Sequence, residues 1–327
     1  MFHSKLSNSF NIKLKNISKK LILIFGHIRP DGDSIGSQIA LTRCCKLLGY
    51  NAQAVIVEPI PRIFKSFIQD TSFIKYDQLD IRKKYTIITV DCANLTRTGK
   101  RFNQVNNSIY MNVDHHISNL SYAKNNYIIA NFSSTSEILA SFMIDQNLPI
   151  DLVSARALYM GIATDTGQFK YTYMTTRIFS IIQYLVKLGI NPEEIANDLY
   201  TKESLQRMQL LSNFLKTLQL EIDGKVCIGY LYDNSYKEAG AAKEDSAGFV
   251  NYTNAIKGVK IGVLLEELKG NIKGSLRAKN KKYCLNKIAA KFKGGGQECA
   301  AGFMLSGNIK SFYPELKLRL KEHLLKV

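Results

Sequence analysis

The sequence predicts an α/β protein of two domains, and three observations lead to this fold class. The chain has 327 residues, which is long for one average domain and sufficient for two. In its first half, short continuous apolar runs alternate with helical patterns, as in parallel strands joined by helices. From Glu221 onwards a turn and a new series of strands begin. We therefore expect a mostly parallel sheet with helices on both faces, followed by a smaller α/β domain.

The first domain is expected to be a βαβ series. Residues 21–25 form a continuous apolar run, which is typical of a strand buried on both faces. Residues 35–48 then carry apolar side chains at helical spacing, and Gly49 ends that helix. Further strands are expected at residues 52–57, 85–90 and 108–113, and further helices at residues 134–147 and 154–162.

The second domain is expected to follow a helical connector. Pro192 begins a helical region, and residues 203–220 continue it with a pattern polar enough for a linker. The Asp223-Gly224 turn then opens the second domain. Its strands are expected at residues 226–232, 259–266 and 271–277, and its helices at residues 285–292 and 313–325. The resulting boundaries are residues 1–200 for the first domain, 201–221 for the linker and 222–327 for the second domain.

The composition is that of an ordinary globular protein, with 46% hydrophobic and 22% charged residues. No apolar run approaches the roughly 18 residues of a membrane span, and residues 21–25 are too short for the core of a signal peptide. We therefore expect a cytoplasmic protein without a membrane partner. The six cysteines form no C-x-x-C pair, so we expect reduced thiols rather than a zinc–thiolate site.

The net charge of +17 favours anionic partners, but lysine is abundant along the whole chain and the total alone means little. The distribution is more informative, because residues 269–293 contain nine basic side chains and no acidic one. A local cluster of this kind favours a site for an anionic ligand.

The most informative segment for chemistry is residues 27–37. It places His27, Asp31 and Asp33 directly after a buried strand, and the carboxyl ends of strands line the binding crevice of an open α/β sheet. A proline and a glycine between these residues enforce a tight path that can turn the side chains toward one point. Imidazole and carboxylate ligands together suit Mn²⁺, among other divalent ions. Taken alone, the segment is equally well explained as a solvated turn with a helix N-cap at Asp33 or Ser34.

The ends of later apolar segments carry the same residue types. Asp91 follows one run, Asp114-His115-His116 follows the next, and Asp165 follows a third, so we expect all of them at strand ends. A single aspartate after a strand is usually a turn former or a helix cap, but this recurrence favours a gathered set of ligands. Carboxylates gathered this closely would repel one another unless bound cations offset their charge.

Together these motifs resemble the DHH phosphoesterase family, in the subgroup that carries a C-terminal DHHA1 domain. The four N-terminal family motifs match residues 27–37, Asp91, residues 114–116 and residues 165–167. The resemblance extends to residues 91–99, which include Arg97, to residues 133–138, which include Ser134, and to residues 275–277 and 294–302. It covers nearly the whole chain, whose length is similar to that of the nanoRNase and pAp-phosphatase branch.

The resemblance implies a role for each residue of the N-terminal motifs. One Mn²⁺ would be held by His27, Asp31 and Asp91, and the other by Asp33, Asp91, His115 and Asp165. Asp114 would orient an imidazole, and His116 would lie near the scissile phosphate. Two such ions would together activate a water and neutralise charge on the phosphoryl oxygens.

For the second domain, the resemblance implies substrate recognition across a cleft between the domains. Arg277 would grip a phosphate, and the glycines would let backbone N–H groups approach it. The expected substrate-binding residues are Arg97, Ser134, Arg277, Gly294, Gly295, Gly296 and Gln297. The chain departs from the family at Gln297, where histidine is usual, and at Lys293, where glycine is common. Substrate preference is therefore the open question.

The expected function is hydrolysis of short oligoribonucleotides, of pAp-type 3′-phosphonucleotides, or of both. A narrower alternative is a phosphodiesterase for cyclic di-AMP or pApA, which would carry the same motifs. A nucleotide or nucleic-acid sensor without activity is a third reading, but degenerate enzymes normally lose ligands and every ligand position here is filled. The sequence leaves the oligomeric state open, a homodimer included.

Overall fold

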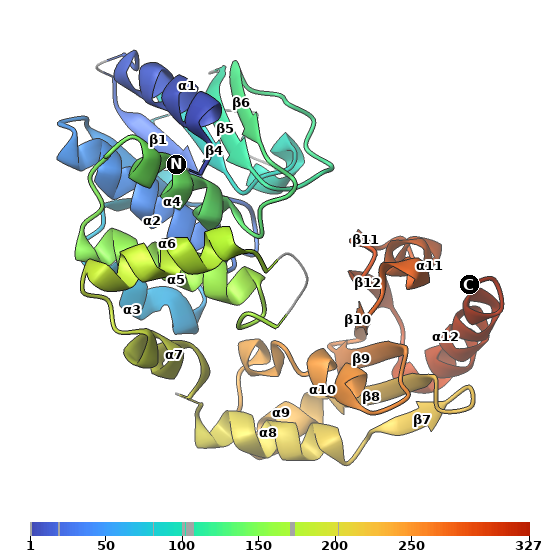
Figure 1. Cartoon of the computed structure of the whole chain (residues 1–327). Helices are drawn as coiled ribbons and strands as arrows, with labels where there is room; N and C mark the ends of the chain where they lie inside the picture. Colours follow the sequence, from blue (N-terminus) through green and yellow to red (C-terminus); the bar gives the residue numbers. More distant parts are fainter. Residues whose placement is uncertain are drawn as a thin grey trace. The chain divides into compact units, whose positions relative to one another are not determined.

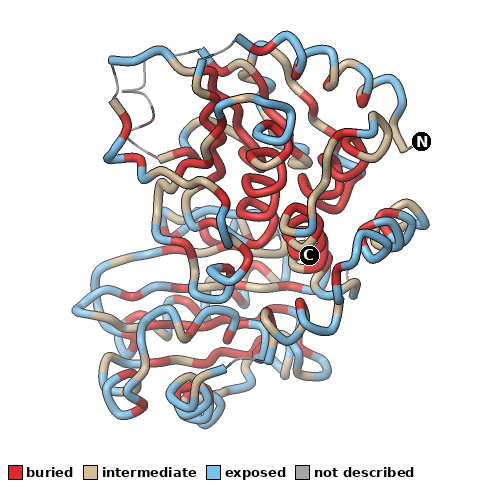
Figure 2. The backbone as a smooth tube through the Cα atoms, turned by 90° about the vertical axis from the view of Figure 1, so that its left-hand side faces the viewer, coloured by how far each residue is buried: buried red, intermediate tan, exposed pale blue. Residues whose placement is uncertain are grey.

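The computed structural model describes residues 2–18, 20–80, 82–99, 102, 108–170, 174–201 and 203–327. They form two compact units, Met1–Lys202 and Glu203–Val327, each of which combines a sheet with helices (Figure 1). The predicted α/β class and the two-domain organisation are confirmed. The buried residues, red in Figure 2, run along the strands and along the inner sides of the helices. None of the described helices combines the length and the apolar character needed to cross a membrane.

The first unit is built on a six-stranded sheet with the order β3-β2-β1-β4-β5-β6, in which all neighbours are parallel. Its strands are β1 (Ile22–Phe25), β2 (Ala52–Ile56), β3 (Phe73–Lys75), β4 (Thr86–Val90), β5 (Ile109–Asp114) and β6 (Asn125–Ile128). The chain leaves β1 toward β2 and later returns to β4 on the other side of β1. In sheets of this kind, ligands bind at the carboxyl ends of the two strands where the order reverses, here β1 and β4.

The two faces of this sheet are covered differently. Ile22 and Ile24 belong to a large core with the α-helices, whereas Leu23 and Phe25 belong to a smaller core with Tyr76. The helices of the unit are α1 (Ser4–Lys15), α2 (Gly32–Leu47), α3 (Lys65–Ile68), α4 (Thr135–Asp145), α5 (Leu152–Asp165), α6 (Thr176–Lys187) and α7 (Pro192–Tyr200). Three short 3₁₀ helices are described as well: η1 (Arg62–Phe64), η2 (Tyr76–Gln78) and η3 (Leu95–Thr98).

The second unit is built on a mixed six-stranded sheet with the order β11-β12-β10-β9-β8-β7. The strands are β7 (Gln219–Glu221), β8 (Val226–Tyr232), β9 (Ile261–Leu268), β10 (Asn271–Ala278), β11 (Gly295–Gly296) and β12 (Ala300–Ser306). Only the β8–β9 pair is parallel among these described neighbours. One core contains residues of α11 (Leu285–Lys291) and α12 (Ile309–Leu324), and the other contains residues of α8 (Leu205–Leu215), α9 (Asp233–Ala239) and α10 (Val250–Ala255).

The strands and helices expected at the ranges given above are present, with ends that differ by a few residues, except that the expected helical connector ends in strand β7. Elements that the pattern did not predict include α1, α6, β3, β6 and β12. The segment expected as a linker contains α8, whose Leu210 and Phe214 pack with Leu231 and Phe249 of the second unit. Each of the six cysteines is a free thiol.

Candidate metal centre

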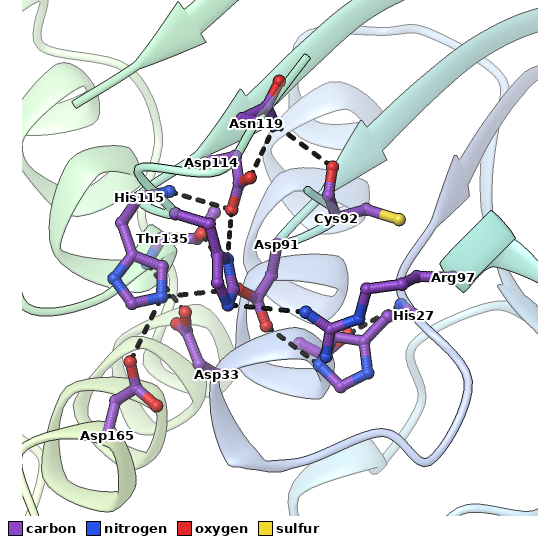
Figure 3. Close-up of polar contacts among 12 residues, drawn as sticks. His27, Asp33, Asp91, Cys92, Arg97, Asp114, His115, Asn119, Thr135 and Asp165 are labelled. Carbon is purple, nitrogen blue, oxygen red and sulfur yellow. Dashed lines mark hydrogen bonds and ion pairs between the residues drawn. The ribbon is translucent and has the colours of Figure 1, made fainter. Parts of the chain in front are cut away.

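The candidate site lies at the carboxyl ends of the central strands of the first unit (Figure 3). His27 follows β1 after one glycine, Asp91 directly follows β4, and Asp114 is the last residue of β5. These strands are neighbours in the sheet, so residues far apart in the sequence meet at one edge. This is the position at which the strand order reverses and ligands are expected to bind.

The two aspartates of the first motif take different roles in the helix α2 that follows it. Asp31 is the N-cap, and its Oδ1 accepts a hydrogen bond of 3.0 Å from the backbone N–H of Ser34. Asp33 lies in the first turn and is buried. The cap and the ligand interpretations of this motif are therefore compatible, because the half-exposed Asp31 still directs its other oxygen to His27 at 3.5 Å.

His27 is oriented like a metal ligand. Its Nδ1 donates a hydrogen bond of 2.7 Å to the backbone oxygen of Ile28, so Nε2 is the ring nitrogen that is available to a ligand. That Nε2 lies 3.2 Å from Asp91 Oδ2 and 3.5 Å from Asp31 Oδ2, and it has no hydrogen-bond partner among the described atoms. Burial lowers the pKa of His27, but the two carboxylates outweigh burial and raise the pKa to about 11. A cation among these three groups would replace the proton on Nε2 and offset the charge of the carboxylates.

Asp91 faces two groups of side chains at once. Its Oδ2 is directed to His27, whereas its Oδ1 lies 3.6 Å from His115 Nε2 and 3.5 Å from His116 Nδ1. The backbone at Asp91 has φ +54°, in the left-handed region that aspartate tolerates better than most residues. Thr135 donates a hydrogen bond of 3.4 Å from its hydroxyl to Asp91 Oδ1. The carboxylate can therefore bridge two sites.

The second group combines Asp33, His115 and Asp165, whose ligand atoms lie within 4.8 Å of one another. His115 Nε2 is 3.3 Å from Asp165 Oδ2. α5 passes close to this group, since a side chain at Gly161 would collide with Ser136 of α4 and would meet Asp33 Oδ1 at 3.0 Å. Asp165 is the last residue of α5, so the prediction that it ends a strand is wrong. The helix predicted at residues 154–162 continues up to this aspartate.

The electrostatics of this second group favour a cation. Burial and the charge of Asp91 raise the pKa of Asp33 well above its usual value. Burial and the charge of Asp33 do the same for the pKa of Asp165. Burial also lowers the pKa of His115, so its imidazole is held in the neutral form that binds metals. Bound divalent cations would remove the repulsion among the carboxylates.

Asp114 is fully buried behind the two histidines and fixes their geometry. Its Oδ1 accepts hydrogen bonds from His116 Nδ1 at 2.8 Å and from the backbone N–H of His115 at 2.9 Å. Its Oδ2 accepts a bond of 2.6 Å from Asn119, a residue that the sequence did not single out. Burial alone would raise the pKa of Asp114, but the bond to His116 outweighs it and lowers that pKa. The imidazole that Asp114 orients is therefore that of His116.

Two of the expected substrate contacts of the first unit take different positions. Arg97 lies on η3 with its Nη1 3.4 Å from His116 Nε2, beside the cluster. Ser134 is fully buried, and its hydroxyl accepts the N-cap hydrogen bond of 3.0 Å from the backbone N–H of Glu137. Its neighbour Thr135 is the residue that reaches Asp91. The structure thus gives Ser134 the role of a helix cap.

In the second unit, β12 brings the glycine segment and Arg277 close together. Gly296 in β11 pairs with Ala301 of β12, and Arg277 in β10 pairs with Ala300 on the other side. Gly296 has φ +139°, and a side chain there would meet the carbonyl oxygen of Ala300 at 2.5 Å. Arg277 is half-buried and donates a hydrogen bond of 3.0 Å to the backbone of Leu276.

Of the remaining positions of the segment, Gln297 and Gly295 are exposed and Gly294 is not. Gln297 is exposed and donates its backbone N–H to Ala300 at 2.7 Å, which closes the hairpin between β11 and β12. Gly294 is confined, because a side chain there would collide with Gly302. Gly295 is different, since a side chain there would meet nothing within 4 Å. Packing within the chain therefore explains Gly294 and Gly296 but leaves Gly295 unexplained.

Comparison with known families gives two matches that together cover most of the chain. Residues 21–162 match the DHH family, N-terminal domain. Residues 223–322 match the DHHA1 domain. The first match contains all the candidate metal ligands except Asp165, and the second contains Arg277 and the glycine segment.

Individual relatives match the chain over nearly its full length. A Streptococcus mutans protein named probable bifunctional oligoribonuclease and PAP phosphatase NrnA is 26% identical over 92% of this chain and 95% of its own length. The bifunctional oligoribonuclease and PAP phosphatase NrnA of Thermus thermophilus is 26% identical over 88% of this chain and 84% of its own length. The crystal structure of an exopolyphosphatase-related protein from Bacteroides fragilis superimposes with a TM-score of 0.90 and 25% identity, over 99% of this chain and 98% of that one.

Proposed function

Because this chain joins a DHH N-terminal domain to a DHHA1 domain and so belongs to the DHH family of phosphoesterases, we propose that it hydrolyses short oligoribonucleotides and pAp-type 3′-phosphonucleotides with two divalent cations. The observation that carries the proposal is the position of Asp91, whose two oxygens face two separate groups of ligand side chains. The names of the two relatives supply the substrate class.

The donor set fits divalent cations, and Mn²⁺ is the ion we expect. One ion would be held by His27, Asp31 and Asp91, and the other by Asp33, Asp91, His115 and Asp165. When bound, paired ions lower the pKa of a water and offset the charge on phosphoryl oxygens during in-line displacement. The buried Nε2 of His27 between two carboxylates and the raised pKa values of Asp33 and Asp165 support this assignment.

The residues around the cluster would bind and orient the phosphate. Asp114 holds Nδ1 of His116 and thereby directs Nε2 of the same ring toward Arg97. Burial lowers the pKa of His116, but the bond to Asp114 outweighs it and raises the pKa, so a protonated Nε2 is favoured. A phosphate oxygen lying beside both side chains would accept one hydrogen bond from Nε2 and a second from the guanidinium.

The proposal is tested by product analysis on pAp, pApA, cyclic di-AMP and RNA of two to about ten nucleotides, with Mn²⁺ and with a chelator. We expect turnover of short RNA, pAp or both with Mn²⁺ and loss of turnover with the chelator. Turnover confined to cyclic di-AMP or pApA would replace the proposed substrate class by the narrower alternative. Tight binding of a nucleotide without any product would identify a sensor and contradict the proposal.

Two neighbouring glycines allow the role of the glycine segment to be separated from its packing. Gly296→Ala should lower the melting temperature, because its φ and the nearby carbonyl oxygen of Ala300 both disfavour a side chain. Gly295→Ala should leave the melting temperature within about 2 °C, yet raise KM for phosphorylated substrates several-fold if backbone N–H groups approach the phosphate there. Thermal unfolding and steady-state rates on both variants decide this. An unchanged KM for Gly295→Ala would show that no ligand approaches that position.

Gln297→His is expected to change the ratio of activities on pAp and short oligonucleotides several-fold. Gln297 is exposed at the tip of the hairpin, where family members usually have histidine. Histidine can carry a charge near its ordinary pKa of about 6.5, whereas glutamine binds only through neutral hydrogen bonds. Rates on both substrates across the pH range, and the bound metal content, should be measured side by side.

Glu298→His is the matched control for this substitution, because it places the same ring on the adjacent exposed residue. The control should leave the ratio of activities near that of the unmodified chain. Superimposable pH profiles and equal ratios for Gln297→His would mean that this side chain does not select substrates.

A further inference from the structure

The N-terminus of α4 holds one of the candidate metal ligands by its backbone. The N–H groups of Thr135 and Ser136 donate to Asp33 Oδ2 at 2.7 Å and to Asp33 Oδ1 at 2.8 Å. Both oxygens of the Asp33 carboxylate are thus fixed by consecutive amides of a single helical turn. Figure 3 shows Thr135 and Asp33 within the cluster. The position of that turn therefore sets the orientation of the Asp33 carboxylate relative to His115 and Asp165.

A buried charge pair holds this turn in place. Glu137, in the first turn of α4, is fully buried, and its Oε2 accepts a hydrogen bond of 2.6 Å from the backbone N–H of Ser133. Its Oε1 lies 2.7 Å from Nε of Arg177, which comes from α6. Glu137 is therefore linked both to the chain entering α4 and to a separate helix.

Arg177 contacts the segment that enters α4 at three points. Besides Glu137, its Nη2 donates a hydrogen bond of 3.2 Å to the backbone oxygen of Asn131. Its guanidinium also lies 3.6 Å from the ring centroid of Phe132. The planar, forked guanidinium can make all three contacts together, whereas a lysine ammonium is a single point charge.

The place of Arg177 on its own helix makes these contacts more significant. It is the second residue of α6, where the helix dipole is positive and a cation is disfavoured. The contacts of the Arg177 side chain with the segment before α4 explain an arginine at this position, whereas the stability of α6 does not.

We propose that Arg177 is a positioning residue for the second cation site: by holding Asn131, Phe132 and Glu137, it fixes the turn whose amides orient Asp33. The inference rests on the proposed function, because it assumes that Asp33, His115 and Asp165 bind a cation. In the first site, formed by His27, Asp31 and Asp91, the same turn reaches only Asp91, through the Thr135 hydroxyl at 3.4 Å, so we expect a smaller effect there. Outer contacts of this kind typically change metal affinity by roughly 10- to 100-fold.

The experiment measures Mn²⁺ binding to the full chain by the electron paramagnetic resonance signal of the free ion, in a double-mutant design. Asp31→Ala weakens the first site and leaves the second as the tighter one, and Asp33→Ala does the reverse. Arg177→Lys is introduced into each background, because lysine keeps the charge beside Glu137 and preserves the fold. We expect Arg177→Lys to lower the affinity of the remaining site roughly 10- to 100-fold in the Asp31→Ala background, and less than twofold in the Asp33→Ala background.

Arg43→Lys is the matched control. Arg43 also holds a carboxylate at a helix N-terminus, with Nε 2.7 Å from Asp151, the N-cap of α5. The candidate ligand of that helix, Asp165, lies at its opposite end, so the control should change neither affinity. Equal losses from Arg177→Lys in both backgrounds, or no loss in either, would overturn the inference while leaving the two-cation function intact. An unmodified chain that binds fewer than two Mn²⁺ ions would overturn the two-cation function and the inference with it.

Discussion

Asp91→Ala is expected to abolish turnover, with a loss in kcat of more than about 10³-fold, or about 4 kcal/mol of transition-state stabilisation. The physical reason is that one carboxylate serves two groups of ligands, with Oδ2 directed to His27 and Oδ1 to His115. Removing it would weaken both candidate sites together. Rates measured on short RNA with saturating Mn²⁺ test the prediction, and exhaustive chelation of the unmodified chain should produce the same loss.

Asp91→Asn separates loss of the ligand charge from damage to the fold, because asparagine keeps the shape of the side chain. In the metal-free protein the charge of Asp91 raises the pKa values of both Asp33 and Asp165 by repulsion. The substitution removes this repulsion and also the ion pair of Asp91 with His27, so the metal-free melting temperature of each protein serves as its own reference. Added Mn²⁺ should raise the melting temperature of the unmodified chain but not that of the variant, since Mn²⁺ stabilises a folded protein only if the folded protein binds it. Full activity of either variant would exclude a bridging role.

Arg277→Ala has the second-largest expected effect, a rise in KM of roughly 30-fold for phosphorylated substrates, equivalent to about 2 kcal/mol. Arg277 lies on β10 beside Ala300 of β12, and the glycine strand β11 pairs with the other edge of β12. A charged hydrogen bond to a substrate phosphate is lost in the variant, whereas the metal ligands belong to the other unit. Inhibition by a non-hydrolysable dinucleotide measures binding directly, and metal content should stay constant.

Lys279→Ala is the control for net charge, because Lys279 is an exposed cation two residues further along the same segment. We expect it to raise KM by less than threefold, as a distant charge is screened by salt. Equal effects from both substitutions would indicate a general attraction to the basic segment. No effect from Arg277→Ala would exclude phosphate recognition through this side chain.

The sheet of the first unit could be predicted because its strands are buried on both faces and therefore read as continuous apolar runs. Ile22 to Phe25 is the clearest example, with alternate side chains in two different cores. The strand-end motifs could be located for the same reason, since an acidic residue after such a run stands out. What these motifs have in common is their place at one edge of a parallel sheet.

Other elements gave weaker signals. α1 buries only Ser7, Phe10 and Leu14, and its remaining residues are polar or partly exposed. α6 has buried residues Ile178, Ile181 and Leu185 at clear helical spacing, and counting this period would have found it. The short strand β3 carries no alternating pattern.

The contacts that orient the ligands were beyond the sequence, because they join residues distant in the chain. Nothing in the pattern connects Asp33 to the amides of residues 135 and 136, or Glu137 to Arg177. Ser134 was assigned to substrate because it lies in a family motif, but the structure uses its hydroxyl as a cap. A motif indicates which segment is important and does not show which of its atoms face the ligand.

The order of the two units along the chain has a consequence for biosynthesis. Every candidate metal ligand lies between His27 and Asp165, inside the unit that ends at Lys202, and the glycine segment comes far later. Ribosomes add roughly 5–20 residues per second and domains generally fold as they emerge, so the second unit takes on the order of ten seconds to appear after Lys202. If the candidate sites bind cations, the nascent first unit would be able to bind them during that interval, before the segment expected to select a substrate has been translated.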